Sequence, residues 1–226
     1  MTEPTTSAQQ HRTSTVIAID GPAGAGKSTV GRAVAAELGV GYLDTGAMYR
    51  AVTHAVLRRG VDPYHEADVA EVAATIDLDV YDEDGRTQVM VDGESATVEI
   101  RGREVTGAVS AVAANSAVRA ELVRRQRDWV DAHGGGVVEG RDIGSVVFPD
   151  ADLKLFVTAS PRVRAERRVA ETGGDVDEVE ASIIERDRHD SSRADSPLME
   201  ATGSRVVDTT GMSIDDVVAE ITGMLR

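Results

Sequence analysis

The chain has 226 residues, 41% of them hydrophobic, which is enough for a substantial buried core and indicates neither a fibrous nor a disordered protein. It has no cysteine, so disulfides, thiolate nucleophiles and cysteine metal sites are excluded, and its net charge of −15 disfavours nonspecific binding to nucleic acid. Residues 1–14 contain no apolar segment, and nowhere do about eighteen apolar residues run together. We therefore expect a disordered tail over residues 1–14 and a cytoplasmic protein with no nucleic-acid and no membrane partner.

A glycine-rich motif follows the first predicted strand. Val16 to Ile19 is a short apolar, β-branched run typical of a strand buried on both faces, and Thr29 to Leu38 has helical spacing. Between them GPAGAGKST fits the pattern GxxxxGK[ST], in the strand, loop and helix context where backbone N–H groups and a helix N-terminus hold phosphate. The motif predicts that a nucleoside triphosphate binds to Gly21, Pro22, Ala23, Gly24, Ala25, Gly26, Lys27, Ser28 and Thr29. Lys27 would reach the β- and γ-phosphates, and the Ser28 hydroxyl would ligate Mg²⁺.

The next segments predict a small antiparallel insertion between helices. A short strand is expected at 42–44, and helices over 45–59 and 66–75. From Ile76 to Ile100 apolar and acidic residues alternate around Asp84-Gly85 and Asp92-Gly93, dipeptides typical of tight turns between strands. An antiparallel sheet with one solvated face shows this alternation, so we interpret the acidic residues as solvated rather than as a metal site.

The second half of the chain alternates helices with short strands. Helical spacing runs from Val105 to Ala132 with a break near Asn115, which can cap a second helix, and Gly134 to Gly136 ends it. Further strands are expected at 137–139, 153–157 and 206–208. Further helices are expected from Ser160-Pro161 to about 171, over about 176–191, and after Ser213. Strands alternating with helices predict an α/β fold, a parallel sheet flanked by helices on both faces.

Four further sequence blocks follow in chain order: LDTGAMYR (43–50), EGRDIGSVVFPDA (139–151), ERDRHDSSRADSPL (185–198) and VVDTTGMSIDDVV (206–218). Together they resemble the cytidylate kinase family of P-loop nucleoside monophosphate kinases. The resemblance covers essentially the chain from Val16 onward. It implies one domain over residues 15–226, with a monophosphate-binding insertion at about 61–105 and a helical lid at about 160–192. It also implies that ATP donates its γ-phosphoryl group to CMP or dCMP with Mg²⁺, and we expect a monomer.

The resemblance implies roles for the residues of the monophosphate site. Arg50, Arg141 and Arg193 match phosphate-clamping arginines, and Arg186 and Asp190 match residues near the sugar. The residues that match readers of cytosine are Ser110, Arg119 and Asp142, and Thr45 and Tyr49 match further lining. A carboxylate accepts a hydrogen bond from the N4 amino group of cytosine, whereas the O4 of uracil would be repelled.

Arginines before a double glycine match the mobile lid of such kinases. Arg164, Arg167 and Arg168 precede Gly173-Gly174, and arginines carried by a closing lid stabilise transition-state charge. The catalytic candidates are therefore Lys27, Arg141, Asp142, Arg167 and Arg168. Because the second pKa of a phosphate monoester lies near 6, the acceptor is mostly a dianion and needs no general base. One departure from the family is Glu139, where many relatives have aspartate, so its role toward Mg²⁺ stays open.

For several of these residues, interpretations without a functional role stay open. Arg119 shares a helix with Arg124, Arg125 and Arg127, and an arginine-rich helix face is usually solvated. Arg186 and Asp190 are four residues apart and could form a surface pair worth about 0.3–0.5 kcal/mol. The lid arginines could belong to a solvated helix.

Other functions share the glycine motif. A GTPase would need a guanine-reading NKxD-type segment, which the sequence lacks. A shikimate-type kinase is the alternative enzyme, although it would not need the blocks at 43–50 and 185–198. A nucleotide-binding regulator without turnover is the alternative outside enzymes.

Overall fold

The computed structural model describes residues 15–192 and 198–225, so the tail predicted over residues 1–14 and the candidate Arg193 lie outside the described residues. A parallel five-stranded sheet forms the centre in the order β2-β6-β1-β7-β8. Its strands are β1 (Thr15–Asp20), β2 (Tyr42–Asp44), β6 (Gly135–Glu139), β7 (Leu153–Thr158) and β8 (Arg205–Asp208). The predicted parallel α/β fold is confirmed. After β1 the chain continues to β2 at one edge of the sheet, and after β6 it continues to β7 on the opposite side. Sheets of this kind bind ligands at the carboxyl ends of two adjacent strands whose connections diverge in this way, here β1 and β6.

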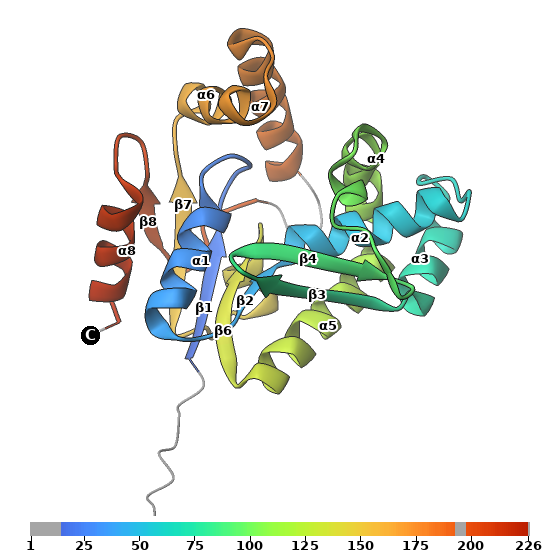
Figure 1. The fold of residues 1–226 in the computed structure, drawn as a ribbon, viewed down its shortest axis with the longest axis horizontal. Helices are drawn as coiled ribbons and strands as arrows, with labels where there is room; N and C mark the ends of the chain where they lie inside the picture. Colours follow the sequence, from blue (N-terminus) through green and yellow to red (C-terminus); the bar gives the residue numbers. More distant parts are fainter. Residues whose placement is uncertain (1–14, 193–197, 226) are drawn as a thin grey trace, which may run out of the picture.

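Helices cover both faces of this sheet (Figure 1). On one face α1 (Lys27–Leu38) and α8 (Ile214–Gly223) bury Ile17 and Ile19 of β1. On the other, α2 (Thr45–Arg58), α3 (Glu66–Thr75) and α5 (Ser116–His133) share a second core with Ala18. Because alternate residues of β1 enter different cores, the strand is apolar throughout. None of the helices in residues 15–192 and 198–225 is long and apolar enough to span a bilayer.

The antiparallel insertion forms as predicted. Its strands are β3 (Leu78–Glu83), β4 (Arg86–Val91) and β5 (Glu94–Ser95), and a short 3-10 helix η1 (Glu99–Arg101) and α4 (Arg103–Ala114) follow. Arg32 of α1 joins this sheet to the core, with Nε 2.9 Å from Oδ1 of Asp82 and Nη2 2.6 Å from Oγ1 of Thr87. The insertion is therefore fastened to the helix that begins inside the glycine motif.

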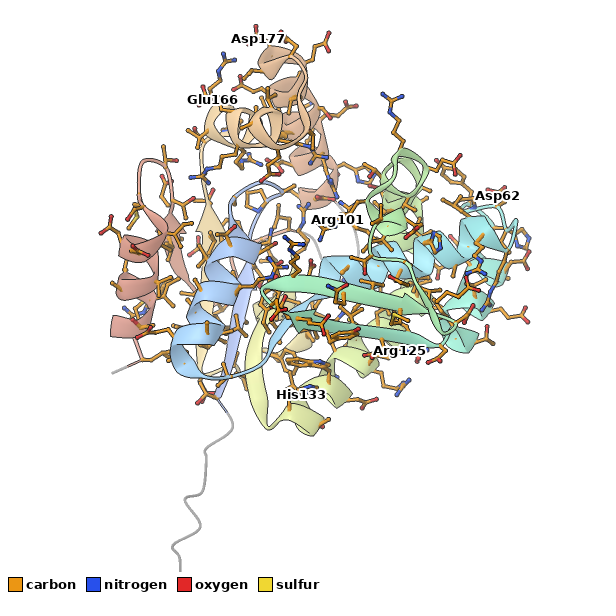
Figure 2. The ribbon with its side chains drawn as sticks, in the orientation of Figure 1. Asp62, Arg101, Arg125, His133, Glu166 and Asp177 are labelled. Atoms are coloured by element: carbon orange, nitrogen blue, oxygen red, sulfur yellow. The ribbon has the colours of Figure 1, made fainter. Side chains whose placement is uncertain are left out.

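The two helices of the predicted lid are α6 (Pro161–Thr172) and α7 (Val176–Ser191). They pack against each other and lie at the top of Figure 1, above the loop between β1 and α1. Ser160 caps α6 by accepting from the Val163 N–H, and Arg162 pairs with Asp177 and Glu180 across the two helices. Figure 2 shows Glu166 and Asp177 at the outer end of this helical pair.

Two local features differ from the sequence-based expectation. The triple glycine does more than end α5: Gly134 is its left-handed cap, with φ 65°, but β6 already begins at Gly135. A Cβ on Gly136 would lie 2.9 Å from the Trp129 ring, so a glycine is needed for the indole to pack on the strand. The other feature is an unpredicted single-turn π-helix η2 (Ile143–Val147) directly after Asp142.

Candidate active site

The glycine motif forms the loop that connects β1 to α1. Gly26 caps α1 with φ 89°, a left-handed conformation that disfavours side chains and turns the loop into the helix N-terminus. Lys27 Nζ donates to the carbonyl of Pro22 at 3.0 Å, and burial lowers the pKa of Lys27 to about 8. Gly24 and Thr29 are exposed, whereas Ala25 is buried. The lysine therefore carries a desolvated charge against the loop that would receive the phosphates.

A buried carboxylate lies beside the first turn of α1. Ser28 Oγ donates to Oε1 of Glu139 at 2.6 Å, and the Tyr42 hydroxyl donates to the same oxygen at 2.5 Å. The other oxygen, Oε2, is buried and has no hydrogen-bond partner among the described residues. Burial, followed by the charge of Asp44, raises the pKa of Glu139.

These groups fit a magnesium ion held largely by phosphates and water. The described part of the chain has no group of three histidine or acidic side chains that could hold a metal on its own. Mg²⁺ keeps several waters and typically takes only one or two protein ligands next to substrate phosphates. A serine hydroxyl and an unpartnered buried carboxylate oxygen match that requirement.

Arg119 and Asp142 form a buried pair. Arg119 Nη2 of α5 lies 2.5 Å from Oδ2 of Asp142, which follows β6, and both residues are at most 8% exposed. The guanidinium also lies 6.0 Å from the centre of the Tyr49 ring on α2. The interpretation of Arg119 as part of a solvated arginine face is wrong; Arg124 and Arg127 are the exposed arginines of the same helix. The pair therefore joins α5 to the loop after β6 and fixes the orientation of both side chains.

Arg141, Arg186 and Asp190 also converge. Asp190 of α7 is 1% exposed, and its Oδ2 lies 2.5 Å from Arg141 Nη1 and 3.9 Å from Arg186 Nε. The interpretation of Arg186 and Asp190 as a surface pair on one helix is therefore wrong. Their contact with Arg141 links α7 to the loop after β6, so residues of both elements form one cluster.

A group of like charges surrounds Arg50. The Arg50 side chain contacts Oγ1 of Thr106 at 3.3 Å, and burial, followed by the charge of Arg186 and then of Arg168, lowers its pKa. Arg101 adds to the same positive field, and Figure 2 labels it near the centre of the view. Buried cations that repel one another are stabilised by an anion placed between them, so this group fits a phosphate.

The remaining lining residues have smaller roles in the geometry. Thr45 is buried and its hydroxyl donates to the carbonyl of Glu139 at 2.7 Å. Ser110 is half-buried on α4, and its hydroxyl makes no hydrogen bond within the described ranges 15–192 and 198–225. Thr45 therefore supports the backbone of the site, whereas Ser110 keeps its hydroxyl available.

The three arginines of α6 differ in position. Arg167 donates to Oγ1 and the carbonyl of Thr209, at 3.1 and 3.0 Å, and lies near the Ala25 carbonyl. The Arg168 guanidinium makes no hydrogen bond or ion pair with the part of the chain that the structure describes, and its charge acts on Arg50. Arg164 is only 3% exposed and belongs to the scaffold rather than to a mobile arm.

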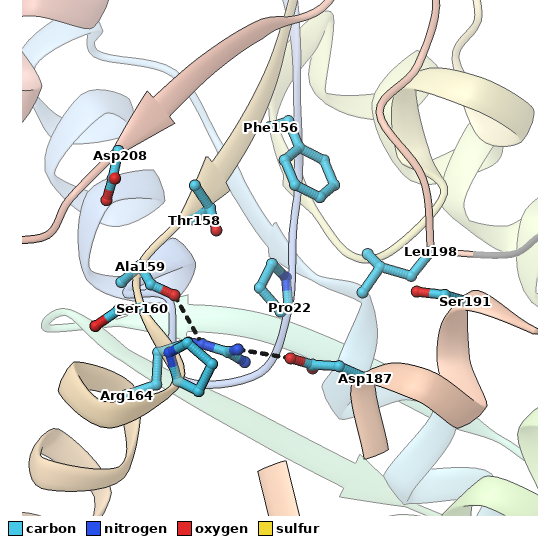
Figure 3. A pocket seen from close by; sticks show the side chains of 11 residues that line it. Pro22, Phe156, Thr158, Ala159, Ser160, Arg164, Asp187, Ser191, Leu198 and Asp208 are labelled. Carbon is cyan, nitrogen blue, oxygen red and sulfur yellow. Dashed lines mark hydrogen bonds and ion pairs between the residues drawn. The ribbon is translucent and has the colours of Figure 1, made fainter. Parts of the chain in front are cut away.

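Arg164 crosses the pocket drawn in Figure 3, which has a volume of about 450 Å³. It donates to the carbonyl of Ala159 at 3.0 Å and pairs with Asp187 at 2.6 Å, and it reaches the P-loop carbonyl of Ala23 at 3.1 Å. None of the described monophosphate-site candidates lines this pocket. The pocket lies between the P-loop and the two helices of the predicted lid, apart from the convergence of arginines.

Sequence reasoning missed Asp20. This carboxylate is 2% exposed and accepts from the N–H groups of Ile143 and Gly144, both at 2.7 Å. Burial raises the pKa of Asp20 to about 6. The bonds anchor the π-helix to the end of β1 and so fix the loop that carries Arg141 and Asp142. An acidic residue directly after the apolar run of residues 16–19 was the available signal.

Known proteins are similar to this chain over nearly all of its length. The sequence model of the cytidylate kinase family matches residues 17–226. A cytidylate kinase from Mycobacterium leprae is 48% identical over 95% of this chain and 96% of its own length. One from Corynebacterium efficiens is 47% identical over 91% and 92%. A solved uncharacterized protein from Eubacterium ventriosum shares the fold alone, with a TM-score of 0.52 at 10% identity over 93% of this chain and 98% of that chain. A family match over nearly the whole chain, with near-half identity to both relatives, shows that the chain belongs to the cytidylate kinase family.

Proposed function

We propose that this chain transfers the γ-phosphoryl group of ATP to CMP or dCMP, giving ADP and CDP or dCDP, by alignment and charge stabilisation. The observation that carries the proposal is that the two candidate loops follow adjacent strands of the parallel sheet. The loop with Lys27 follows β1, and Arg141 and Asp142 follow the neighbouring strand β6. A donor site and an acceptor site built on adjacent strand ends would hold two phosphates in line.

On the donor side, the backbone of residues 21–29 and Lys27 would hold the β- and γ-phosphates. Ser28 would ligate Mg²⁺ and Glu139 would accept from its water shell; when bound, the ion would neutralise phosphate charge. Thr209 supports this loop from outside, because its hydroxyl donates to the Ala25 carbonyl at 3.1 Å. The chain's own residues thus supply orientation and positive charge.

On the acceptor side, Arg50 and Arg141 would clamp the monophosphate, and Arg186 and Asp190 would lie near the sugar. The mutual repulsion around Arg50 supports a dianionic ligand there. Such a ligand is already a nucleophile at neutral pH, so no side chain has to remove a proton. This explains an active site rich in arginine, in which no histidine is among the candidates.

For the base, the buried pair of Arg119 and Asp142 supports recognition of cytosine. Asp142 would accept from the N4 amino group, and Arg119 would donate to the ring carbonyl or nitrogen edge. Because both partners are desolvated, a uracil O4 facing the carboxylate would leave two acceptors opposed. Ser110, Thr45 and Tyr49 would complete the wall of this pocket.

An acceptor assay tests the proposed function. ADP release would be followed with ATP, Mg²⁺ and one of CMP, dCMP, UMP, AMP or shikimate. We expect fast turnover with CMP and dCMP, slower turnover with UMP and none with shikimate. Turnover with shikimate alone would identify a hydroxyl kinase, and ATP binding without any acceptor-dependent ADP would identify a regulator.

Base choice should depend on Asp142. In Asp142→Asn the hydrogen bond to N4 is weakened and an amide donor faces uracil O4, so the CMP to UMP ratio of kcat/KM should fall about 5- to 150-fold, equivalent to about 1–3 kcal/mol. The substituted amide keeps an oxygen for Arg119, which favours a folded variant. Steady-state kinetics with both acceptors measures the ratio.

A matched control exists on the surface of α5. Arg124 and Asp128 also pair at 2.5 Å, but their side chains are 58% and 60% exposed. Asp128→Asn should leave the ratio unchanged. A ratio that stays at the wild-type value in Asp142→Asn would place base reading on other residues.

We further propose, from the composition and the family, a monomer that works in the cytoplasm. The preference between CMP and dCMP depends on contacts near the 2′ position, where Arg186 and Asp190 are the candidates. Parallel kinetics with the two acceptors would measure it.

A further inference from the structure

The carboxylate at the magnesium end of the site is held asymmetrically. Oε1 of Glu139 receives two hydroxyl donors, from Ser28 at 2.6 Å and from Tyr42 at 2.5 Å, whereas Oε2 receives none from the described residues. Glu139 is 3% exposed. Leaving a buried carboxylate oxygen without a donor is unfavourable, so its orientation must be imposed by its neighbours.

Tyr42 is built into the core to provide this hydroxyl. It lies on β2, which pairs with β6 in a register that sets Tyr42 opposite Val137 and Asp44 opposite Glu139. The ring packs on α1 at Gly31, where a Cβ would come within 2.9 Å of it. A larger residue at 31 would displace the ring, so the close approach of helix and strand directs the hydroxyl toward Glu139.

A second contact limits the freedom of the ring. The Arg32 guanidinium lies 4.8 Å from the ring centre, and Arg32 is itself bound to Asp82 and Thr87 of the insertion. Burial and the neighbouring carboxylates raise the pKa of the Tyr42 phenol, so it stays protonated and acts as a donor. The tyrosine is thus fixed by strand, helix and cation together.

We propose that Tyr42 is a positioning residue that holds Oε1 of Glu139 and thereby presents Oε2 to the water shell of Mg²⁺, an inference that rests on the proposed donor site. Glutamate has one more rotatable bond than aspartate and reaches farther from the strand. With Ser28 as its only donor, the carboxylate could rotate and offer either oxygen. The Tyr42 hydroxyl removes that freedom, which makes the longer acid usable at this position.

The test uses Tyr42→Phe, which deletes the hydroxyl and keeps the ring. Loss of an outer hydrogen bond around a metal site typically weakens metal affinity 10- to 100-fold. We expect the Mg²⁺ concentration for half-maximal activity to rise about tenfold, while KM for CMP stays unchanged. Calorimetry gives a readout independent of turnover: Mg²⁺ should strengthen ATP binding about tenfold less in the variant than in the wild type, with equal affinity for ATP in EDTA.

Two comparisons isolate the role of the hydroxyl. Tyr64→Phe deletes the same group from a side chain on a residue that is 78% exposed, and it should match the wild type. In a Glu139→Gln background, Tyr42→Phe should have no further effect on the Mg²⁺ response, because it acts through the carboxylate. Thermal unfolding in EDTA checks that each variant is folded.

The outcomes separate this role from the donor site itself. A wild-type Mg²⁺ response in folded Tyr42→Phe would overturn the positioning role and leave the donor site intact. Equal loss of ATP affinity with and without Mg²⁺ would also overturn it, since that pattern indicates general packing. Wild-type protein that binds ATP no better with Mg²⁺ than in EDTA would overturn the proposed donor site together with the inference.

Discussion

Lys27→Ala is expected to lower kcat for CMP-dependent ADP formation by about 10²–10³-fold while the protein stays folded. Removing a preorganised charge from a site where phosphate charge shifts costs turnover on that scale. The fold should not suffer, because Lys27 lies where the loop meets α1 and its side chain makes one hydrogen bond to the described residues, with the Pro22 carbonyl. Burial lowers its pKa to about 8, so the free protein already bears a cost for holding that charge.

The matched control is Lys154, the only other lysine of the chain. Its Nζ also donates at 3.0 Å to the carbonyl of a proline five residues earlier, Pro149. Lys154→Ala removes the same charge and the same type of bond away from the crevice, and it should keep wild-type turnover. Initial rates with saturating CMP and a thermal unfolding curve for each variant make the comparison. A folded Lys27→Ala protein that keeps most of its activity would rule out the assigned role.

The phosphate loop could be predicted from the sequence because its determinants are local. The strand, the glycine spacing and the helix lie within about 25 consecutive residues, and the residue pattern of each indicates its backbone conformation. Asp84-Gly85 and Asp92-Gly93 are equally local: Asp84 and Asp92 both have φ 51° in the turns that the sequence predicts. The conformation of such elements is determined by residues that are adjacent in the sequence.

The arrangement of the monophosphate site could not be predicted in the same way. Nothing in the spacing of α5 distinguishes Arg119 from Arg124; the difference is that only Arg119 faces the loop after β6. Asp190 is similarly buried by a contact with Arg141, far away in sequence. These are long-range contacts set by strand order and helix packing. The resemblance to the family indicated the residues but not the contacts between them.

The predicted lid shows both cases within one helix. The place of Arg164, Arg167 and Arg168 before Gly173-Gly174 and their match to the family's lid predicted a shared function, yet α6 turns them in different directions. Arg164 is fixed to the P-loop carbonyl of Ala23 and to Asp187, whereas Arg168 acts electrostatically on Arg50. A sequence pattern identifies which helix carries the charges, and the helix orientation decides which of them reaches the crevice.

Arg168→Ala is expected to lower kcat at least about a hundredfold and to raise either KM much less. Arginines that stabilise charge in phosphoryl transfer contribute on that scale or above it. The Arg168 guanidinium makes no hydrogen bond or ion pair with residues 15–192 and 198–225, so its contacts would form chiefly when both substrates are bound and would belong to the transition state. Arg167→Ala should also lower kcat more than it raises KM. Some rise in the KM for ATP is expected as well, because Arg167 braces Thr209 beside Ala25.

Arg188→Ala on α7 is the control, because this exposed arginine belongs to the same pair of helices. A solvated arginine should tolerate removal within about 0.5 kcal/mol of unfolding free energy and without loss of turnover. If Arg168 were merely another solvated charge, its variant would behave as the Arg188 variant does. Steady-state kinetics on Arg167→Ala, Arg168→Ala and the double variant, with circular dichroism for folding, decide the matter. Wild-type kcat in the folded double variant would end the lid proposal, because no transition-state contact from α6 would then remain to be lost.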